Sequence, residues 1–343
     1  MLKQFILQVM SGEHLKVEQA EAAMQIIMSG QGNPSQIAAL LTALKIRGET
    51  SEEIAGFAKT MKRYGVHIDK KDKEVIDTCG TGGGQKPTFN ISTTVAFVVA
   101  GAGLTVAKHG NRAVSSTCGS ADVLKALSVE VDIPPQQVAG MMEEVGIGFL
   151  YAPRFHQAMK YAAGVRKELG FRTLFNLLGP LTNPANADSQ LIGVYEPALT
   201  EKLGGALLEM DVKRAMVVHS MDGMDEISAS APTQVTEVRD GKMQTYLINP
   251  QEYGFTFGSE PVCKGGTPEE NAKTVLSVLQ GHKGPNRDIV LINSAAALWV
   301  GQKAQSLEEG IKLAAESIDS GAALAKLEGM RTFTQSCQEG LLC

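Results

Sequence analysis

A strand, a glycine-rich turn and the start of a helix follow one another in Val75-Ile-Asp-Thr-Cys-Gly-Thr-Gly-Gly-Gly-Gln-Lys-Pro-Thr-Phe-Asn-Ile-Ser-Thr-Thr94. Residues 75–77 suit a short buried strand, and residues 92–101 suit a buried helix. Four of the five residues from 80 to 84 are glycine, so backbone N–H groups can approach an anion without obstruction by Cβ atoms. The spacing matches neither a Walker loop nor the dinucleotide fingerprint. The stretch predicts an α/β unit with an anion-binding turn, and the alternative is an ordinary surface turn before a capped helix.

Strand-like and helix-like segments alternate through much of the remaining chain. Further strands are predicted at 105–107, 190–194, 215–218 and 288–292, and helices at 121–127 and 135–145. Alternation of this kind is typical of an α/β fold with a central, largely parallel sheet flanked by helices.

The first 64 residues have a helical pattern instead. Apolar residues recur at intervals of three and four in residues 17–28, 35–46 and 51–61, which predicts short stacked helices. We therefore expect a small N-terminal α-helical domain at residues 1–70, completed by helices from about 155–190, and a large α/β domain at 71–343.

Three later segments carry local signals. Residues 155–169 have helical periodicity and stop at Gly170, which suits a left-handed cap. Residues 176–184 are predicted to form a loop because Asn, Gly and Pro recur there. Ser306 and Glu309 form a capping-box pattern that predicts an amphipathic helix running toward Leu327.

The composition narrows the functional class. The chain has 343 residues, 43% of them hydrophobic and 20% charged, which favours a folded globular protein over a disordered one. A net charge of −5 argues against general affinity for nucleic acid. Neither a signal peptide nor a membrane-length apolar run is apparent, so we expect a cytoplasmic protein. The five cysteines lack CxxC spacing, which favours reduced thiols over a disulfide framework or a zinc site.

A second group of polar residues follows the predicted strand at 105–107. The segment Lys108-His-Gly-Asn-Arg-Ala-Val-Ser-Ser116 combines three basic side chains with an amide and two hydroxyls, and Gly119-Ser120 then opens a helix. Loops at consecutive parallel strand ends face one crevice. The pattern predicts a second anion-binding loop beside the first, and a solvated turn is the alternative.

Six motifs resemble, in their usual order, the signature loops of the anthranilate phosphoribosyltransferase family: GTGG (80–83), TFNIST (88–93), KHGNRAVSS (108–116), GSADVL (119–124), RTLFNLLGPLTNP (172–184) and DGMDE (222–226). The resemblance implies transfer of phosphoribosyl from 5-phosphoribosyl 1-pyrophosphate to anthranilate. The products would be N-(5-phosphoribosyl)anthranilate and pyrophosphate, in the second step of tryptophan synthesis from chorismate. It also implies the nucleoside phosphorylase/phosphoribosyltransferase fold, a homodimer, and Mg²⁺ as cofactor with two ions per monomer.

The resemblance further implies which residues form the site. Lys108 and Asn111 would act electrostatically, with no covalent nucleophile and no strong general base. The donor would contact Gly80, Gly82, Gly83, Gly84, Thr88, Asn90, Ile91, Ser92, Thr93, Lys108, His109, Gly110, Asn111, Arg112, Ala113, Val114, Ser115, Ser116 and Ser120. Anthranilate would contact Gly80, Asn111, His156, Arg166 and Pro180. The metal ligands would be Ser92, Asp225 and Glu226.

Two of these assignments are open when the residues are taken alone. The segment Asp222-Gly-Met-Asp-Glu226 suits either a solvated acidic loop or oxygen ligands for Mg²⁺. Arg166 suits either a surface ion pair with Glu168 or bidentate binding of a carboxylate.

The chain departs from the family pattern at several positions. Gly84 replaces a usual acidic residue, Gln85 a usual Gly, Thr117 a frequent Lys or Arg, Cys118 a frequent Ser and Gln157 a frequent Pro. We expect altered affinity for metal or donor with activity retained. The competing hypotheses are a pyrimidine nucleoside phosphorylase-like enzyme and a nucleic-acid-binding relative that lacks the chemistry.

Overall fold

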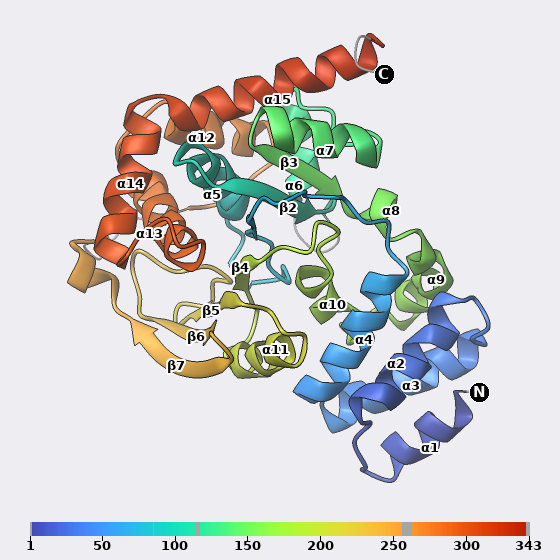
Figure 1. The fold of residues 1–343 in the computed structure, drawn as a ribbon. Helices are drawn as coiled ribbons and strands as arrows, with labels where there is room; N and C mark the ends of the chain where they lie inside the picture. Colours follow the sequence, from blue (N-terminus) through green and yellow to red (C-terminus); the bar gives the residue numbers. More distant parts are fainter. Residues whose placement is uncertain (1, 85, 114–116, 256–262, 341–343) are drawn as a thin grey trace.

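The computed structural model describes residues 2–84, 86–113, 117–255 and 263–340, and its centre is a sheet of seven strands (Figure 1). The strand order is β3-β2-β1-β4-β5-β6-β7. The strands are β1 (Val75–Asp77), β2 (Thr105–Gly110), β3 (Ile147–Tyr151), β4 (Ser189–Gly193), β5 (Arg214–Ser220), β6 (Thr233–Arg239) and β7 (Lys242–Ile248). The first five pair in parallel, and β5, β6 and β7 pair antiparallel. The predicted largely parallel α/β sheet is confirmed.

Helices surround this sheet and form the N-terminal lobe. They are α1 (Lys3–Met10), α2 (Val17–Met28), α3 (Pro34–Arg47), α4 (Ser51–Arg63), α5 (Ile91–Gly101), α6 (Ser120–Ala126), α7 (Pro135–Glu144), α8 (Ala152–Phe155), α9 (Lys160–Leu169), α10 (Phe175–Leu178), α11 (Ala198–Glu209), α12 (Pro268–Leu279), α13 (Pro285–Val300), α14 (Leu307–Asp319) and α15 (Ala322–Gln338). Three short 3-10 helices are η1 (Gln157–Met159), η2 (Gly179–Leu181) and η3 (Pro250–Tyr253). No helix in the described ranges has the length and apolar character needed to cross a membrane.

Two hydrophobic cores lie on opposite faces of the sheet. Strand side chains alternate between faces, and on β5 the side chains of Met216 and Val218 belong to the core that contains α5 and α13. Those of Ala215 and Val217 belong to the core that contains α1–α4, α9, α10 and α11. In Figure 1 the blue N-terminal helices accordingly lie next to the green α9 and α10, far from the red C-terminal helices. The helical lobe is therefore anchored on one face of the sheet.

The predicted strand at 288–292 is wrong, because these residues lie inside helix α13. Pro285 occupies the first turn, where its missing N–H costs nothing, and the helix runs for 16 residues. Nearly all its side chains are buried, so the apolar run has no amphipathic period that would distinguish a buried helix from a buried strand.

Three further predictions need correction. The predicted loop at 176–184 contains most of α10 and all of η2. The helix predicted from Ser306 breaks at Gly321, which has a φ of +80°, and so forms α14 and α15. The helix predicted at 155–169 is interrupted near His156, although its left-handed end at Gly170 is confirmed by a φ of +66°.

Strands β3, β6 and β7 were not predicted. β6 and β7 form a hairpin whose two turn residues, Asp240 and Gly241, have φ values of +50° and +72°. Asp-Gly is a strong signal for such a hairpin, so this pair was detectable in the sequence. β7 is mostly exposed, which weakened its apolar pattern.

A buried carboxylate holds the N-terminal helices together. Glu53 is fully buried, pairs with Arg47, and accepts the backbone N–H groups of Leu15 at 2.8 Å and Thr50 at 3.0 Å. We expect Glu53→Ala to lower the free energy of unfolding by about 3–5 kcal/mol, because it leaves a largely buried cation unpaired. Denaturant titration measures this loss. Glu52→Ala, on the exposed side of the same helix turn, is the control, and equal effects of the two changes would contradict the prediction.

Candidate active site

The expected loops converge at one edge of the sheet. Strands β2, β1, β4 and β5 are neighbours and run parallel, so their carboxyl ends share this edge. The chain proceeds from β1 outward through β2 and β3, then returns to the other side of β1 with β4. Such a reversal opens a crevice for ligands in α/β sheets. Segments 78–90, 111–119 and 221–232 leave strand ends there.

The glycine turn packs closely on the end of β4. The Thr81 N–H donates to the Gly193 carbonyl at 2.8 Å, and a Cβ on Gly80 would lie 2.9 Å from that oxygen. Gly82 and Gly83 have φ values of +66° and +85°, which only glycine adopts without strain. The turn therefore requires glycine both for its conformation and for its close approach to β4.

The next glycine lies against the acidic loop. A Cβ on Gly84 would lie 2.5 Å from Asp225 Oδ1, and a Cβ on Gly193 would lie 1.6 Å from the Asp225 carbonyl oxygen. The glycine turn, the end of β4 and the acidic loop are therefore in direct contact. This agrees with the expectation that the glycine turn and the acidic loop lie at one crevice.

Lys108 is a buried cation between the two loops. It lies within strand β2 rather than in the following loop, with 3% of its surface exposed. Its Nζ donates to the Thr78 carbonyl at 3.0 Å and to Ser92 Oγ at 3.3 Å. Burial lowers the pKa of Lys108, and the charges of groups including Asp77 and Glu226 oppose that shift. The ammonium group is thus held beside the glycine turn and the start of α5.

The start of α5 is tied to distant parts of the chain. Asn90 precedes the helix, and its Oδ1 accepts the Asn271 Nδ2 at 3.0 Å and the Cys118 thiol at 3.3 Å. Thr88 forms a bridge with Lys264. Ile91 is buried, and the buried Thr93 Oγ1 has no hydrogen-bond partner among the described residues.

The second loop is held by its own backbone contacts. Asn111 Oδ1 accepts the Arg112 N–H at 2.8 Å, and the Asn111 carbonyl accepts Ser120 Oγ at 3.2 Å. The Ala113 N–H donates to Asp122 at 2.8 Å. A Cβ on Gly110 would lie 2.2 Å from Ser120 Oγ. Val114, Ser115 and Ser116 lie outside the described residues.

The acidic loop has the properties of a cation site. Burial raises the pKa of Glu226 well above its usual range, and the neighbouring Asp225 adds to the rise. Burial also raises the pKa of Asp225. Glu226 Oε2 and Asp222 Oδ1 are buried and lack hydrogen-bond partners within the described ranges. A hard divalent cation satisfies such oxygens, so this donor set fits Mg²⁺.

Two of the expected acceptor residues, His156 and Pro180, lie next to His109, which was expected to contact the donor. His109 Nδ1 is 3.0 Å from the Gly179 carbonyl, and its ring centroid is 5.1 Å from that of His156. Burial lowers the pKa of His109 to about 3 and that of His156 to about 4, so both rings are neutral at pH 7. The carbonyl of the buried Pro180 accepts Gln190 Nε2 at 2.6 Å.

Arg166 is half-buried on α9. Its Cζ lies 5.3 Å from the centroid of the Phe175 ring, and burial lowers its pKa. No ion pair joins it to Glu168 or to another acid in the described residues. A guanidinium that is stacked and lacks an acidic partner favours binding of an external carboxylate over a surface ion pair.

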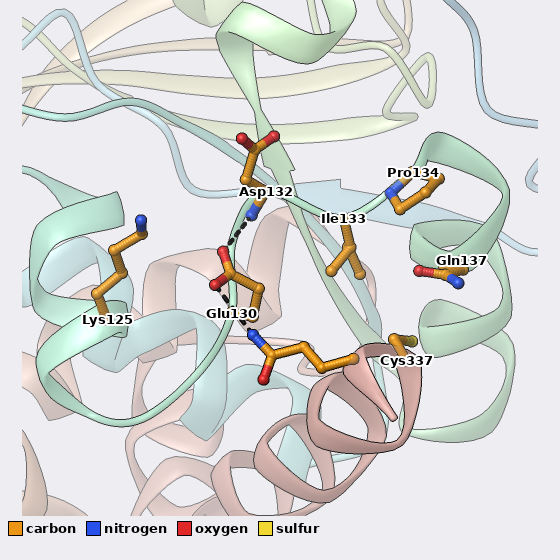
Figure 2. A pocket seen from close by; sticks show the side chains of 8 residues that line it. Lys125, Glu130, Asp132, Ile133, Pro134, Gln137 and Cys337 are labelled. Carbon is orange, nitrogen blue, oxygen red and sulfur yellow. Dashed lines mark hydrogen bonds between the residues drawn. The ribbon is translucent and has the colours of Figure 1, made fainter. Parts of the chain in front are cut away.

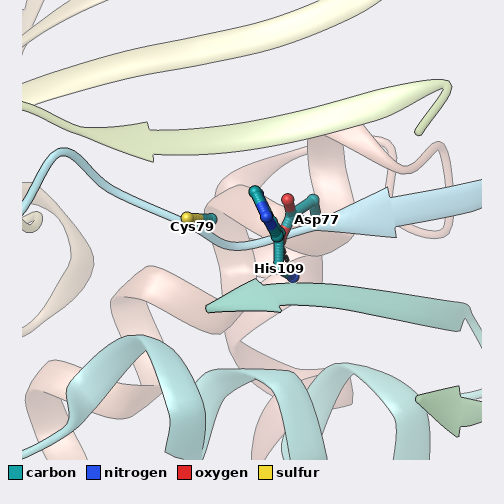
Figure 3. Close-up of side chains that lie close together, drawn as sticks. All are labelled: Asp77, Cys79 and His109. Atoms are coloured by element: carbon teal, nitrogen blue, oxygen red, sulfur yellow. Dashed lines mark hydrogen bonds between the residues drawn. The ribbon is translucent and has the colours of Figure 1, made fainter. Parts of the chain in front are cut away.

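Asp77, Cys79 and His109 form a second cluster, with potential ligand atoms within 4.8 Å of one another (Figure 3). Both Asp77 oxygens are engaged, since Oδ1 accepts the His109 N–H at 3.2 Å and Oδ2 accepts Asn183 Nδ2 at 2.7 Å. Burial raises the pKa of the Cys79 thiol to about 12. Together with the nearby Lys108 cation, these features suit a structural hydrogen-bond network better than a metal centre.

Asp77 is expected to make stability depend on pH. Burial raises its pKa to about 6, against the opposing charge of Lys108. Between about pH 4 and 6 the unfolded state loses the proton that the folded state keeps, so stability falls with rising pH by roughly 3 kcal/mol. Unfolding titrations at pH 4, 5 and 7 should show a steeper decline in the wild type than in Asp77→Asn, which keeps only the contributions of groups such as Asp225 and Glu226. Equal pH dependence in the two proteins would contradict the prediction.

A hollow of about 400 Å³ lies elsewhere, where α6, α7 and the C-terminal helix α15 meet (Figure 2). Its lining contains none of the expected site residues. The lining residues are Lys125, Glu130, Asp132, Ile133, Pro134, Gln137, Cys337 and Gln338.

Family models match both parts of this chain. A helical bundle domain of the glycosyl transferase family matches residues 3–65, and the a/b domain of the glycosyl transferase family matches residues 72–324. The chain is 54% identical to an anthranilate phosphoribosyltransferase of Symbiobacterium thermophilum over 97% of its length and 98% of the relative's. The chain belongs to the anthranilate phosphoribosyltransferase family. The relative from Acetivibrio thermocellus, at 53% identity over 98% of this chain and 97% of its own, bears the same name.

Solved structures of this family have the same fold. The anthranilate phosphoribosyltransferase of Thermus thermophilus matches with a TM-score of 0.91 and 42% identity, covering 96% of this chain and 99% of its own. That of Saccharomyces cerevisiae, in complex with PRPP and Mg, matches with a TM-score of 0.89 and 29% identity, covering 98% of each chain.

Two departures from the family pattern have visible partners. Thr117 Oγ1 donates to the Gly266 carbonyl at 3.1 Å, and the Cys118 thiol donates to Asn90 Oδ1. Both therefore connect the second loop to neighbouring backbone or to the α5 start. Gln157 lies in η1, and Gln85 lies outside the described residues.

Several site-shaping residues were not predicted from the sequence. Gly193 has no Cβ and so allows the Asp225 backbone to pack against it. A glycine within a predicted strand is a sequence signal that another backbone segment approaches closely. Arg172 was quoted within a motif without a role, yet its Nη2 donates to the Gly83 carbonyl at 2.8 Å. Thr78 and Asn271 carried no sequence signal for their contacts with Lys108 and Asn90.

Proposed function

We propose that the protein transfers the phosphoribosyl group from 5-phosphoribosyl 1-pyrophosphate to anthranilate, releasing pyrophosphate. The observation that carries the proposal is the convergence of the glycine turn, Lys108 and the acidic pair at one sheet edge. An anion cradle beside a fitted cation site suits a magnesium-bound pyrophosphate.

The donor is proposed to lie between the two loops. The N–H groups of the glycine turn, the α5 start and Asn111 would bind phosphate oxygens, and Lys108 would stabilise charge on the leaving group. Ser92, Asp225 and Glu226 would hold Mg²⁺, with two ions per monomer as part of the proposal. When bound there, Mg²⁺ would act as a Lewis acid toward pyrophosphate.

The acceptor is proposed to lie on the helical side of the crevice. Arg166 would pair with the anthranilate carboxylate, and Gly80, Asn111, the neutral His156 ring and Pro180 would border the aromatic ring. An aromatic amine is uncharged at pH 7, so it can attack ribose C1 without a strong base. Alignment of the two substrates would then supply much of the rate enhancement.

A fluorescence assay tests this function. Anthranilate is fluorescent, and its signal should fall when donor and Mg²⁺ are both present and stay constant when either is omitted. Phosphorolysis of a pyrimidine nucleoside is the matched assay for the competing enzyme class. Nucleoside cleavage without anthranilate consumption would refute the proposal.

The Gly84→Asp change tests the departure from the family pattern. Its carboxylate would enter beside Asp225, because a Cβ added to residue 84 would lie 2.5 Å from Asp225 Oδ1. Without metal, we expect like-charge repulsion to lower stability by about 1–3 kcal/mol. With Mg²⁺ we expect the loss to shrink and the apparent affinity for the ion to rise. Thermal unfolding with and without Mg²⁺ measures both, with Gly84→Asn as an uncharged control, and equal Mg²⁺ dependence in the two variants would contradict this.

A homodimer is also proposed. Leu7 and Met10 on α1 and Ile46 on α3 are 56%, 70% and 82% exposed, and these two helices pack together. Large exposed apolar side chains on adjacent helices are typical of subunit contacts. Ile46→Glu should convert dimer to monomer in light-scattering chromatography, whereas Leu247→Glu on β7 should not. A wild-type monomer would overturn this proposal.

The domain boundaries and location remain part of the proposal. We place the division near residue 70, with residues from about 155–190 completing the helical lobe, since α9 and α10 contribute to its core. A cytoplasmic location agrees with the lack of disulfides among the described cysteines.

A further inference from the structure

Arg172 lies between the two halves of the site. It follows the left-handed Gly170 that ends α9 and precedes α10. Helix α9 packs in the core of the helical lobe and carries Arg166. The segment that contains Arg172 is therefore anchored to the helix proposed to bind the acceptor.

The guanidinium group of Arg172 makes two separate contacts. Its Nη2 donates to the Gly83 carbonyl at 2.8 Å. Its Cζ lies 4.2 Å from the centroid of the buried Tyr195 ring, which follows β4. One planar cation thus joins the glycine turn to the segment that leaves a central strand.

The glycine turn is shaped around this group. A Cβ on Gly83 would lie 2.2 Å from Arg172 Nη2, and the φ of +85° at Gly83 excludes most other residues independently. Lysine cannot make both contacts of Arg172. A planar guanidinium can lie over the Tyr195 ring while its N–H groups donate a hydrogen bond to the Gly83 carbonyl, and an ammonium group has no such plane.

We propose that Arg172 is a positioning residue that couples acceptor helix α9 to the donor turn at Gly82–Gly84. This rests on the proposed function for the identity of the two substrates. Arg172 holds the turn in its anion-binding shape from outside, while the N–H groups of the turn face the donor. Its loss frees the turn and leaves Arg166 and the acceptor subsite in place.

Amide hydrogen exchange tests whether Arg172 orders the glycine turn. In Arg172→Met, the Thr81 amide, which donates to the Gly193 carbonyl at 2.8 Å, should exchange about tenfold faster than in the wild type, because the turn that holds it loses one charged hydrogen bond. Arg239→Met is the matched control, because Arg239 also stacks on an aromatic ring, with its Cζ 5.3 Å from the Trp299 centroid, but lies outside the site. Unchanged exchange at the turn would overturn the proposal.

Steady-state kinetics tests the functional consequence. Arg172→Met should raise the KM for 5-phosphoribosyl 1-pyrophosphate about tenfold and the KM for anthranilate less than about threefold. Arg172→Lys, which keeps the charge, should recover part of the donor affinity. A rise that is equal for both substrates would show a merely structural role and overturn the proposal. If Arg172→Met does not fold, Arg172→Lys and Tyr195→Leu provide the same comparison.

The two proposals fail in different ways. If the wild type consumes no anthranilate, the proposed function fails, and the exchange measurement still decides whether Arg172 orders the turn. If the wild type is active and Arg172→Met has wild-type donor KM and wild-type exchange, only the positioning role fails.

Discussion

Lys108→Met is expected to lower kcat/KM for 5-phosphoribosyl 1-pyrophosphate by about 100- to 1000-fold, the usual cost of removing one preorganised electrostatic contact from a transition state. Lys108 is buried, and its Nζ is held by the Thr78 carbonyl and Ser92 Oγ beside the start of α5. Little reorganisation is therefore needed when negative charge develops on the leaving pyrophosphate. Initial rates over a range of donor concentrations measure the change.

The control for Lys108 must separate charge from folding. Methionine keeps the apolar stem and removes the ammonium group, and Lys125→Met removes an exposed charge from α6 on the same lobe. Thermal unfolding checks that both variants fold. A folded Lys108→Met protein with wild-type kcat/KM would exclude the electrostatic role.

The second large effect is expected at Arg166. Arg166→Ala should raise the KM for anthranilate by about 100-fold with a small change in kcat, because truncation of one partner in a buried charge pair costs about 2–5 kcal/mol. The half-buried guanidinium has no acidic partner in the described part of the chain and is available to an incoming carboxylate. Fluorescence assays at saturating donor measure both constants.

An acceptor without a carboxylate sharpens this test. Aniline should react equally well with the wild type and with Arg166→Ala, because neither enzyme can form the ion pair with it. Lys167→Ala, on the exposed side of α9, should leave the anthranilate KM within about twofold of the wild type. If Arg166→Ala lowers the rates with both acceptors equally, Arg166 does not bind the carboxylate.

Local patterns were sufficient for much of the architecture. The glycine turn after residues 75–77 predicted a strand–turn–helix unit, and helical periodicity predicted α2, α3 and α4. These features depend on interactions between residues that are close together in the chain, so they can be predicted from the order of residues alone. Residues 288–292 were wrongly predicted to form a strand because α13 is buried on almost every side. Its apolar residues therefore do not recur with the period of an amphipathic helix.

The sequence also carried the chemistry of the loops, namely the glycines, Lys108 and the acidic pair. It could not reveal that Arg172 meets Gly83 across 89 residues, or that Asn271 meets Asn90 across 181. Arg172 follows α9 and Asn271 lies in α12, so these pairs form only where those helices pack beside the strand ends of the sheet. Spacing along the chain contains no record of that packing, because it depends on burial of apolar surface over the whole domain and not on any one loop.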